Sequence, residues 1–408
     1  MKPAYQHLRN LAKRTAELAA SEANIRTRGL WEAHNQLQGG RPLVYVRLDS
    51  CWDELLPSCK ETYPDPILGQ IERNLQARFY NAALGFDFVI DPFVTVPAVY
   101  AGPADDALWG VPVVRHQPEM RGSAWVEEPP LKSYRDLDKL RKPPFIFNET
   151  ATKARVDRVR EAIGDLLEVQ VSYDGPIGIS AQIGHVAASL RGMSQLMVDV
   201  MDEPEGVHGL MRFLMEAHLE YLDAMEQQQR VSLNRTRWPF YHPPLVPGEG
   251  SRPTQLKDCW GYAESQEFDL FSPAMFDEFL LAYQVPILAR TTLNDYGCCE
   301  NLSLKYPLLM AKVPGLRLVS VSPWSSMRAA VAATQGRVVL EWRYSPTEVI
   351  FNFAEEQVRK VIRSNLEMAD GAPVVIILQD VETVNGRPEH IRDWTRIAME
   401  LAKTAPNI

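Results

Sequence analysis

Short apolar runs rich in β-branched residues alternate with longer helical patterns, and this alternation constrains the fold most. Near-continuous hydrophobicity is what strands buried on both faces require, and the intervening helical patterns supply the crossovers of a parallel sheet. The clearest runs are Pro42–Leu48, Phe86–Phe93, Leu167–Asp174, Leu316–Val321, Arg337–Trp342 and Pro373–Leu378. Two weaker strands are predicted at Trp260–Gln266 and Leu293–Gly297. Together the strand–helix units predict an α/β protein with a single closed (β/α)8 TIM barrel.

Helical patterns lie between these runs and at the N-terminus. Pro204–Arg230 carries apolar residues at helical spacing, Ser272 before Pro273 is typical of a helix start, and Ala354–Met368 predicts another helix. We expect residues 1–40 to form an N-terminal helical extension. The remaining residues, 41–408, are then the barrel.

Two segments, 102–142 and 234–255, are rich in Pro, Gly, Trp and charge and have no periodicity. Such segments are expected to be long loops over the barrel mouth, and plain surface insertions are the alternative.

Composition narrows the possible partners and the compartment. The 408 residues carry 43 Lys and Arg against 52 Asp and Glu, a net charge of -9, which argues against nucleic acid and anionic membrane surfaces as partners. The longest clean apolar stretch, Ala372–Leu378, is too short to span a membrane, and the charged N-terminus is not typical of a secretory signal. Five cysteines without a CxxC pair fit a reducing compartment, so a cytoplasmic location is expected.

A cysteine-rich segment, Asp295–Glu300, stands where a predicted buried strand ends and a helix begins. The carboxyl ends of barrel strands form the active-site rim, and a thiolate with oxygen ligands is a reasonable zinc environment. We therefore predict Cys298 and Glu300 as metal ligands. Adjacent side chains on an extended backbone point apart, so Cys299 is not expected to bind the same ion as Cys298. The alternative is that both thiols are small buried hydrophobes.

Carboxylates also follow other predicted strands, at Glu264, Glu341 and Asp380. Barrel geometry would bring them together as catalytic residues, although charged groups at strand ends are also the ordinary solvated edge of a sheet. Rings are frequent in the same regions, and an aromatic pocket suits a planar or methyl-bearing ligand. The predicted substrate-binding residues are Tyr296, Trp260, Tyr262, His242 and Trp342, and a plain core role is the alternative.

Common catalytic signatures are missing from the sequence: it has no GxGxxG after a strand, no GxxxxGK[ST], no GxSxG and no HExxH. Several longer segments instead resemble the uroporphyrinogen decarboxylase superfamily, and in particular its branch of corrinoid-linked methyltransferases. These segments are GPIGISAQIGHVAASLRGMSQLMVDVMDEPEGVHGLMRFLMEAHLEYL (175–222), KDCWGYAESQEFDLFSPAMFDEF (257–279), YGCCENL (296–302), VSVSPW (319–324) and LQDVETV (378–384). The resemblance runs from about Pro42 to the C-terminus.

The resemblance implies a (β/α)8 barrel with a zinc ion at its mouth. The His-x-Cys zinc motif of the coenzyme M methyltransferases corresponds here to Tyr296-Gly297-Cys298, and the further cysteine of that family corresponds to the region of Asp380 and Glu382. A metal would therefore have a more oxygen-rich shell. The Arg-rich substrate motif of the decarboxylases is reduced to Arg47 in VRLDSCW (46–52), which argues against decarboxylation of a four-carboxylate porphyrinogen.

The function expected from these features is corrinoid-dependent methyl transfer. The methyl group would move between a small methyl donor or acceptor, plausibly an aromatic methyl ether that is O-demethylated, and the cobalamin of a separate corrinoid protein. Zinc and cobalamin are the expected cofactors, and a homodimer is possible. The alternatives are a uroporphyrinogen decarboxylase-like lyase and a non-catalytic ligand-binding barrel.

Overall fold

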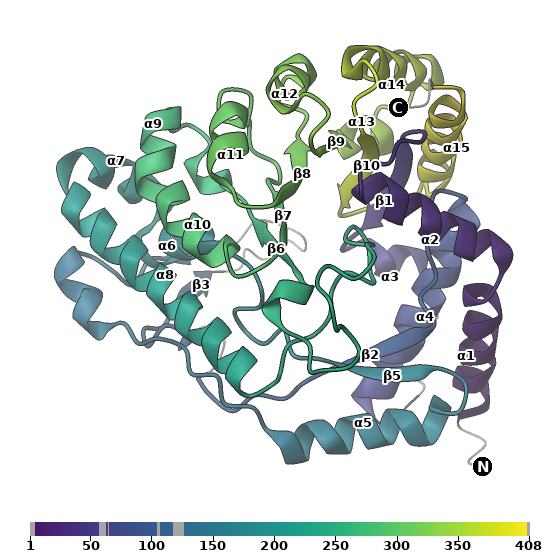
Figure 1. Ribbon diagram of the computed structural model, residues 1–408, viewed down its shortest axis with the longest axis horizontal. Helices are drawn as coiled ribbons and strands as arrows, with labels where there is room; N and C mark the ends of the chain where they lie inside the picture. The colour runs from purple at the N-terminus through teal and green to yellow at the C-terminus, as the bar shows by residue number, and fades with distance from the viewer. Residues whose placement is uncertain (1–4, 57–62, 64, 104–106, 117–125, 406–408) are drawn as a thin grey trace.

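A curled parallel sheet of six strands is the centre of the structure, a computed structural model that describes residues 5–56, 63, 65–103, 107–116 and 126–405 (Figure 1). The strand order is β1 (Leu43–Leu48), β10 (Val374–Val381), β9 (Val339–Tyr344), β8 (Leu316–Val321), β7 (Leu293–Tyr296) and β6 (Trp260–Ala263). A separate parallel pair consists of β2 (Phe93–Pro97) and β5 (Glu168–Ser172), and a short antiparallel hairpin of β3 (Val114–His116) and β4 (Val126–Glu128).

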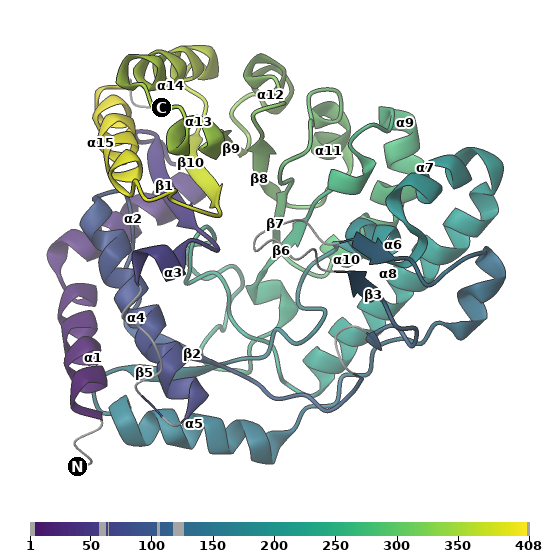
Figure 2. The same ribbon diagram turned by 180° about the vertical axis from the view of Figure 1, so that it is seen from behind.

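Helices cover the outer side of the curled sheet, as both views show (Figure 1, Figure 2). Their bounds are α1 Gln6–Ala19, α2 Glu22–Asn35, α3 Trp52–Leu55, α4 Pro66–Leu84, α5 Glu149–Ile163, α6 Ile183–Arg191, α7 Met193–Asp202, α8 Pro204–Gln227, α9 Pro273–Phe276, α10 Ala282–Leu288, α11 Tyr306–Lys312, α12 Met327–Thr334, α13 Pro346–Ile350, α14 Glu355–Ala369 and α15 Glu389–Thr404. None of these described helices is both long and apolar enough to cross a membrane.

Most of the predicted elements are present. The helix starting at Pro273 is confirmed, and the Ser272 hydroxyl accepts a hydrogen bond from the Met275 amide at 3.2 Å. The predicted strand 86–93 is wrong: the strand there, β2, begins only at Phe93. The assignment of residues 1–40 as a separate unit stays a prediction, although Trp31 of α2 is fully buried in the same cluster as Leu43 of β1.

The closed eight-stranded barrel is not what the described residues form, because no ladder joins β5 to β6 or β1 to β2 among them. Between β5 and β6, side chains take the place of the ladder. The Ser232 hydroxyl accepts from the Tyr173 amide and donates to the Val171 carbonyl at the end of β5. The Asn234 side chain accepts from the Trp260 amide at 2.9 Å and donates to the Trp260 carbonyl at 2.8 Å. These backbone amides and carbonyls at the strand edges therefore have hydrogen-bond partners although the two strands do not pair with each other.

A carboxylate has the corresponding role beside β1. Asp87 accepts the Val44 amide at 2.9 Å and is ion-paired with Arg41, while its own amide donates to the Val44 carbonyl at 3.2 Å. The segment before β2 is thus attached to β1 by one residue instead of by a strand ladder.

The inner face of the six-stranded sheet is apolar at the amino ends of the strands. Trp260, Leu293 and Val339, each the first residue of its strand, belong to one buried cluster. Because side chains alternate along a strand, the residues two positions later also face the interior, nearer the carboxyl ends. These residues are Tyr262, Asp295 and Glu341. The interior therefore changes from apolar to polar along the strands.

The segment 234–255 packs at the apolar end, so the prediction that it covers the barrel mouth is wrong. Trp238 and Phe240 join the buried cluster at the amino ends, where Phe240 stacks on Trp260 with ring centroids 5.0 Å apart. The segment connects α8 to the start of β6, and a helix-to-strand connection must return to the amino end of the sheet.

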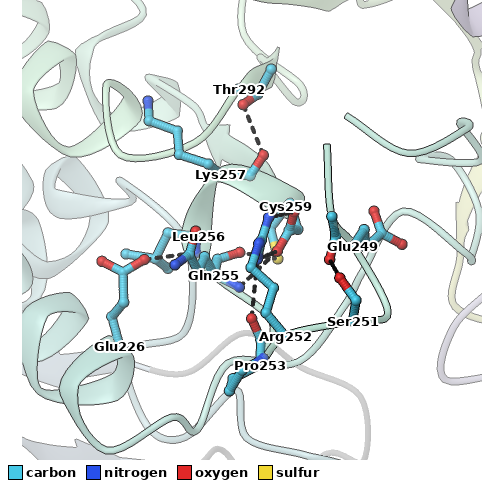
Figure 3. A network of polar contacts seen from close by, with 12 residues as sticks. Glu226, Glu249, Ser251, Arg252, Pro253, Gln255, Leu256, Lys257, Cys259 and Thr292 are labelled. Atoms are coloured by element: carbon cyan, nitrogen blue, oxygen red, sulfur yellow. Dashed lines mark hydrogen bonds and ion pairs between the residues drawn. The ribbon is translucent and has the colours of Figure 1, made fainter. Parts of the chain in front are cut away.

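The end of this segment is fixed beside β6 by a polar network (Figure 3). Arg252 pairs with the buried carboxylate of Asp258, the Leu256 amide donates to Glu226, and the Thr292 hydroxyl donates to the Lys257 carbonyl. The other predicted mouth loop, 102–142, follows β2 at its carboxyl end, and its residues 104–106 and 117–125 lie outside the described residues. Within it, Glu127 of β4 accepts a hydrogen bond from Ser189 of α6.

Replacing Asn234 by alanine tests whether side chains stabilise the sheet where β5 and β6 do not pair. Asn234→Ala leaves the amide and carbonyl of the buried Trp260 without these partners, so we expect the free energy of unfolding to fall by about 2 kcal/mol in urea titrations. As a control, Asn365→Ala removes an amide that bonds only within α14 and should change stability by less than about 0.5 kcal/mol. Equal stabilities of the two variants would contradict the proposed role.

Candidate active site

The carboxyl ends of four strands bring polar side chains together. Glu264 follows β6, Cys298 and Cys299 follow β7, Arg343 lies near the end of β9, and Asp380 lies near the end of β10. Residues 45 and 81 positions apart are thus brought within hydrogen-bonding distance, Arg343 to Cys298 and Asp380 to Cys299.

The two adjacent thiols lie on the same side of the chain. Their sulfur atoms are 3.5 Å apart, contrary to the expectation that they point apart. The reason is that the backbone after Tyr296 is not extended: it turns at Gly297, whose φ of 108° is in the left-handed region. A Cβ at Gly297 would also lie 2.7 Å from Leu302 and 2.8 Å from Ser320, so only glycine fits this turn.

Cys298 is in an environment that favours the thiolate. Hydrogen bonding with Cys299 and the charge of Arg343, whose Nη1 donates to the sulfur at 3.4 Å, lower the pKa of Cys298 to about 7 although burial opposes this shift. Cys299 is the donor in this arrangement, because its hydrogen bond with Cys298, burial and the neighbouring Asp380 all raise its pKa. Asp380 Oδ2 lies 3.3 Å from the Cys299 sulfur and is a second acceptor for this single S–H.

Asp380 is held in an unusual backbone conformation. Its φ of 59° is in the left-handed region, which an aspartate tolerates better than most residues. The carboxylate lies between the Cys299 thiol and the Gln379 amide, whose nitrogen is 3.3 Å from Oδ2. Non-glycine residues in this region cost free energy and are often found at functional sites.

Glu300 connects two loops and has little capacity left for a metal. Its Oε1 accepts from the amide and hydroxyl of Ser265 at 2.8 and 3.0 Å, and its Oε2 accepts from the Cys298 amide at 2.8 Å. The side chain is buried and joins the loop after β6 to the loop after β7. Glu300 therefore has a structural role: it holds the loop after β6 and the backbone of Cys298 together.

Glu264 is a buried carboxyl group with one unpaired oxygen. Oε2 accepts from the Gln266 amide at 2.7 Å, whereas Oε1 is buried without a partner. Burial and the nearby Glu267 raise the pKa of Glu264 to about 8 from an ordinary 4.5. Glu264 is therefore mainly a neutral acid at pH 7, able to donate a proton.

A second acidic residue lies beside Glu264. Glu267 Oε1 is 2.9 Å from Nδ1 of His185 at α6, and this contact raises the pKa of the histidine. Glu267 Oε2 is buried without a partner. The pairing of these two residues was not predicted from the sequence, because the histidine is 82 positions away from its carboxylate.

Arg343 is buried among carboxylates in the interior. It lies 3.6 Å from Glu341 and donates to the Gly297 carbonyl at 3.1 Å. Asp295 is also buried, its Oδ1 has no partner, and burial together with Glu341 raises its pKa well above the ordinary range. The interior therefore holds more buried carboxyl groups than cations near Arg343, so some of the carboxyl groups are protonated at neutral pH.

The predicted aromatic residues are spread over three regions. Trp260 is in the apolar layer, and the ring of His242 lies against it, 6.2 Å between centroids. Tyr296 and Trp342 point to the outer core, where the Tyr296 hydroxyl donates to Gln284 at 2.6 Å. Only Tyr262 lies beside the polar cluster, paired in register with Asp295. Alternation along the strands could have predicted this separation from the sequence. Tyr296 directly follows Asp295 and Trp342 directly follows Glu341, so each ring points to the opposite face of the sheet from the carboxylate before it.

The predicted zinc ligands do not fit a preformed metal site. In the described ranges, no group of three or more His, Cys, Asp or Glu side chains is arranged to hold a metal ion. Both oxygens of Glu300 accept hydrogen bonds from the protein, and Cys298 accepts one from Arg343. The same side chains instead form a hydrogen-bonded cluster of thiols, acids and one guanidinium.

Comparison with known proteins finds likeness at the level of structure. A scan of protein-family models and a search of curated proteins find no match to this sequence. Among solved structures, a methyltransferase from Methanosarcina mazei matches with a TM-score of 0.50 and 14% sequence identity, over 88% of this chain and 94% of the other. At this level of identity the likeness shows a shared fold.

The raised pKa of Glu264 predicts a pH-dependent stability. The unfolded chain releases this proton near pH 4.5 and the folded chain only near pH 8, so folding is progressively penalised as the pH rises through this window. Glu264→Gln does not titrate, and its stability relative to the native chain should therefore increase by about 3 kcal/mol between pH 5 and pH 8. Urea unfolding at both pH values measures this, and a constant difference would contradict the protonated state of Glu264.

The structural role of Glu300 in linking the two loops has a separate test. Glu300→Ala leaves the Ser265 and Cys298 amides without their acceptor, so we expect the free energy of unfolding to fall by about 3 kcal/mol with or without zinc. A main role as a zinc ligand would give another result: added zinc would stabilise the native chain and leave the variant unchanged.

Proposed function

We propose that this protein is a methyltransferase that moves a methyl group between a small substrate and a corrinoid bound to a separate partner protein. The observation that carries the proposal is Glu264, a buried acid with an unpaired oxygen at the carboxyl ends of the strands. The fold shared with a methyltransferase from Methanosarcina mazei supports it, as does the sequence resemblance to corrinoid-linked methyltransferases.

An aromatic methyl ether is the substrate class that this acid suits best. Cleaving the bond between oxygen and methyl leaves the electron pair on oxygen, and a phenolate is a poor leaving group unless it is protonated as it forms. Glu264 donates the proton to the oxygen and becomes a carboxylate, which solvent then reprotonates. The products are a phenol and the methylated corrinoid.

The cobalt(I) form of the corrinoid supplies the nucleophile for the methyl carbon. The protein's own part is alignment and exclusion of water, and alignment alone can contribute several kcal/mol. Tyr262 provides a ring beside the polar cluster, and His185 with Glu267 is placed to help return a proton to Glu264. No step is assigned to zinc, because the predicted ligands are engaged with one another and with the backbone.

Decarboxylation of a porphyrinogen is less compatible with this site. A substrate with four carboxylates requires several free cations, whereas Arg343 is paired with Glu341 and Arg47 with Asp49. The buried carboxyl groups near Arg343 would repel such a substrate further. A homodimer and the identity of the partner remain predictions.

Methyl transfer can be tested directly with free cofactor. Cobalt(I) cobalamin, the protein and a series of methoxylated aromatics should give methylcobalamin, followed by its absorbance spectrum. Glu264→Gln should lower kcat/KM by about a hundredfold for a simple anisole, because the leaving oxygen is no longer protonated. The loss should be much smaller for a nitroanisole, whose phenolate leaves without help.

Glu72→Gln is the matched control, since Glu72 is also buried but lies on α4 beside His7 and Gln76. It should keep the rate of the native chain. An equal loss for all anisoles in Glu264→Gln would contradict proton donation by Glu264. Ligand binding without any methylcobalamin would favour a non-catalytic barrel.

A further inference from the structure

We propose that Cys298 and Cys299 form a reversible oxidation site, in which a hydroperoxide converts the two adjacent thiols into a disulfide. The proposal does not depend on methyl transfer. It rests on the distance between the two sulfur atoms and on the two charged side chains that contact them.

The turn brings the two sulfur atoms close together. The sulfur atoms are 3.5 Å apart, and a disulfide requires about 2.0 Å, so they must approach by about 1.5 Å. The turn at Gly297 already places both side chains on one side of the backbone. Both residues are partly exposed, so a small oxidant can reach them.

The charged neighbours give the two thiols different roles. Arg343 donates an N–H to the sulfur of Cys298 at 3.4 Å, which favours the thiolate that attacks a peroxide. Asp380 accepts the S–H of Cys299 at 3.3 Å, and can remove its proton when this thiol acts second. Such a pair combines a reactive cysteine with an adjacent resolving cysteine.

The other described cysteines have no such arrangement. Cys51 and Cys259 are completely buried, and the Cys259 thiol donates to the Ser232 carbonyl at 3.3 Å. Burial also raises the pKa of each to about 12. Oxidation should therefore be confined to the pair.

The chemical step is balanced as follows. The Cys298 thiolate attacks one oxygen of hydrogen peroxide, the O–O bond breaks, and a sulfenic acid and hydroxide are formed. Cys299 gives its proton to Asp380 and attacks the sulfenic sulfur, so that the S–S bond forms and the S–O bond breaks. The departing hydroxide takes the proton from Asp380 and leaves as water, and the first hydroxide takes up the proton that Cys298 released on forming the thiolate. Overall, two thiols and one peroxide give one disulfide and two waters.

Oxidation would also change the surrounding cluster. Arg343 loses a thiolate partner and Asp380 loses the donor that holds it. The disulfide therefore removes one negative charge beside the buried guanidinium. This links the redox state of the pair to the electrostatics of the candidate site.

The test uses the full chain with Cys59, which lies outside the described residues, replaced by serine. The protein is treated with one equivalent of hydrogen peroxide and digested with trypsin under conditions that block free thiols. Cleavage after Arg290 and Lys305 gives one peptide, 291–305, that holds both cysteines. We expect this peptide to lose the mass of two hydrogens and to regain it after dithiothreitol.

Two further variants separate the pair from ordinary thiol oxidation. Cys299→Ser removes the resolving thiol, so Cys298 should stop at sulfenic acid and then pass to sulfinic acid, which dithiothreitol does not reverse. Cys259→Ser, the control, should form the disulfide as the native pair does. An unchanged peptide mass, sulfinic acid with both thiols in place, or a disulfide between two chains would each overturn the proposal.

Discussion

The buried guanidinium of Arg343 is the interaction on which the candidate site depends. It lies 3.6 Å from Glu341, donates to the Gly297 carbonyl at 3.1 Å and donates to the Cys298 sulfur at 3.4 Å. One side chain of β9 thus stabilises a buried carboxylate and fixes the turn after β7. Removing one partner from a buried charge pair is costly, so these groups form a unit rather than separate contacts.

The division of the interior into an apolar and a polar end gives this unit its chemistry. Rings and aliphatic side chains such as Trp260 and Leu293 close the amino end and exclude water from below. Carboxyl groups above them, including Glu264 and Asp295, are consequently poorly solvated and have raised pKa values. A neutral acid and a thiolate can therefore coexist within one small region at pH 7.

The sheet tolerates gaps because side chains satisfy its open edges. Asn234 bonds both backbone groups of Trp260, and Asp87 accepts the Val44 amide beside β1. These contacts preserve the order of the parallel strands without complete pairing. They also explain why a pattern of eight strand–helix units is compatible with a six-stranded curled sheet and a separate pair.

Local patterns in the sequence determined the long helix α8, the start of α9, helix α14, seven of the strands and the strand-end positions of Glu264, Cys298 and Asp380, because burial periodicity and helix capping act over a few residues. Only the tertiary structure decided how these positions are used. Glu300 links two loops because the amide of Ser265, 35 residues earlier, donates to its Oε1. Cys299 meets Asp380 across 81 residues, and 234–255 packs at the apolar end because its rings complete that layer. Partners at such separations leave no local pattern, since the fold alone brings them into contact.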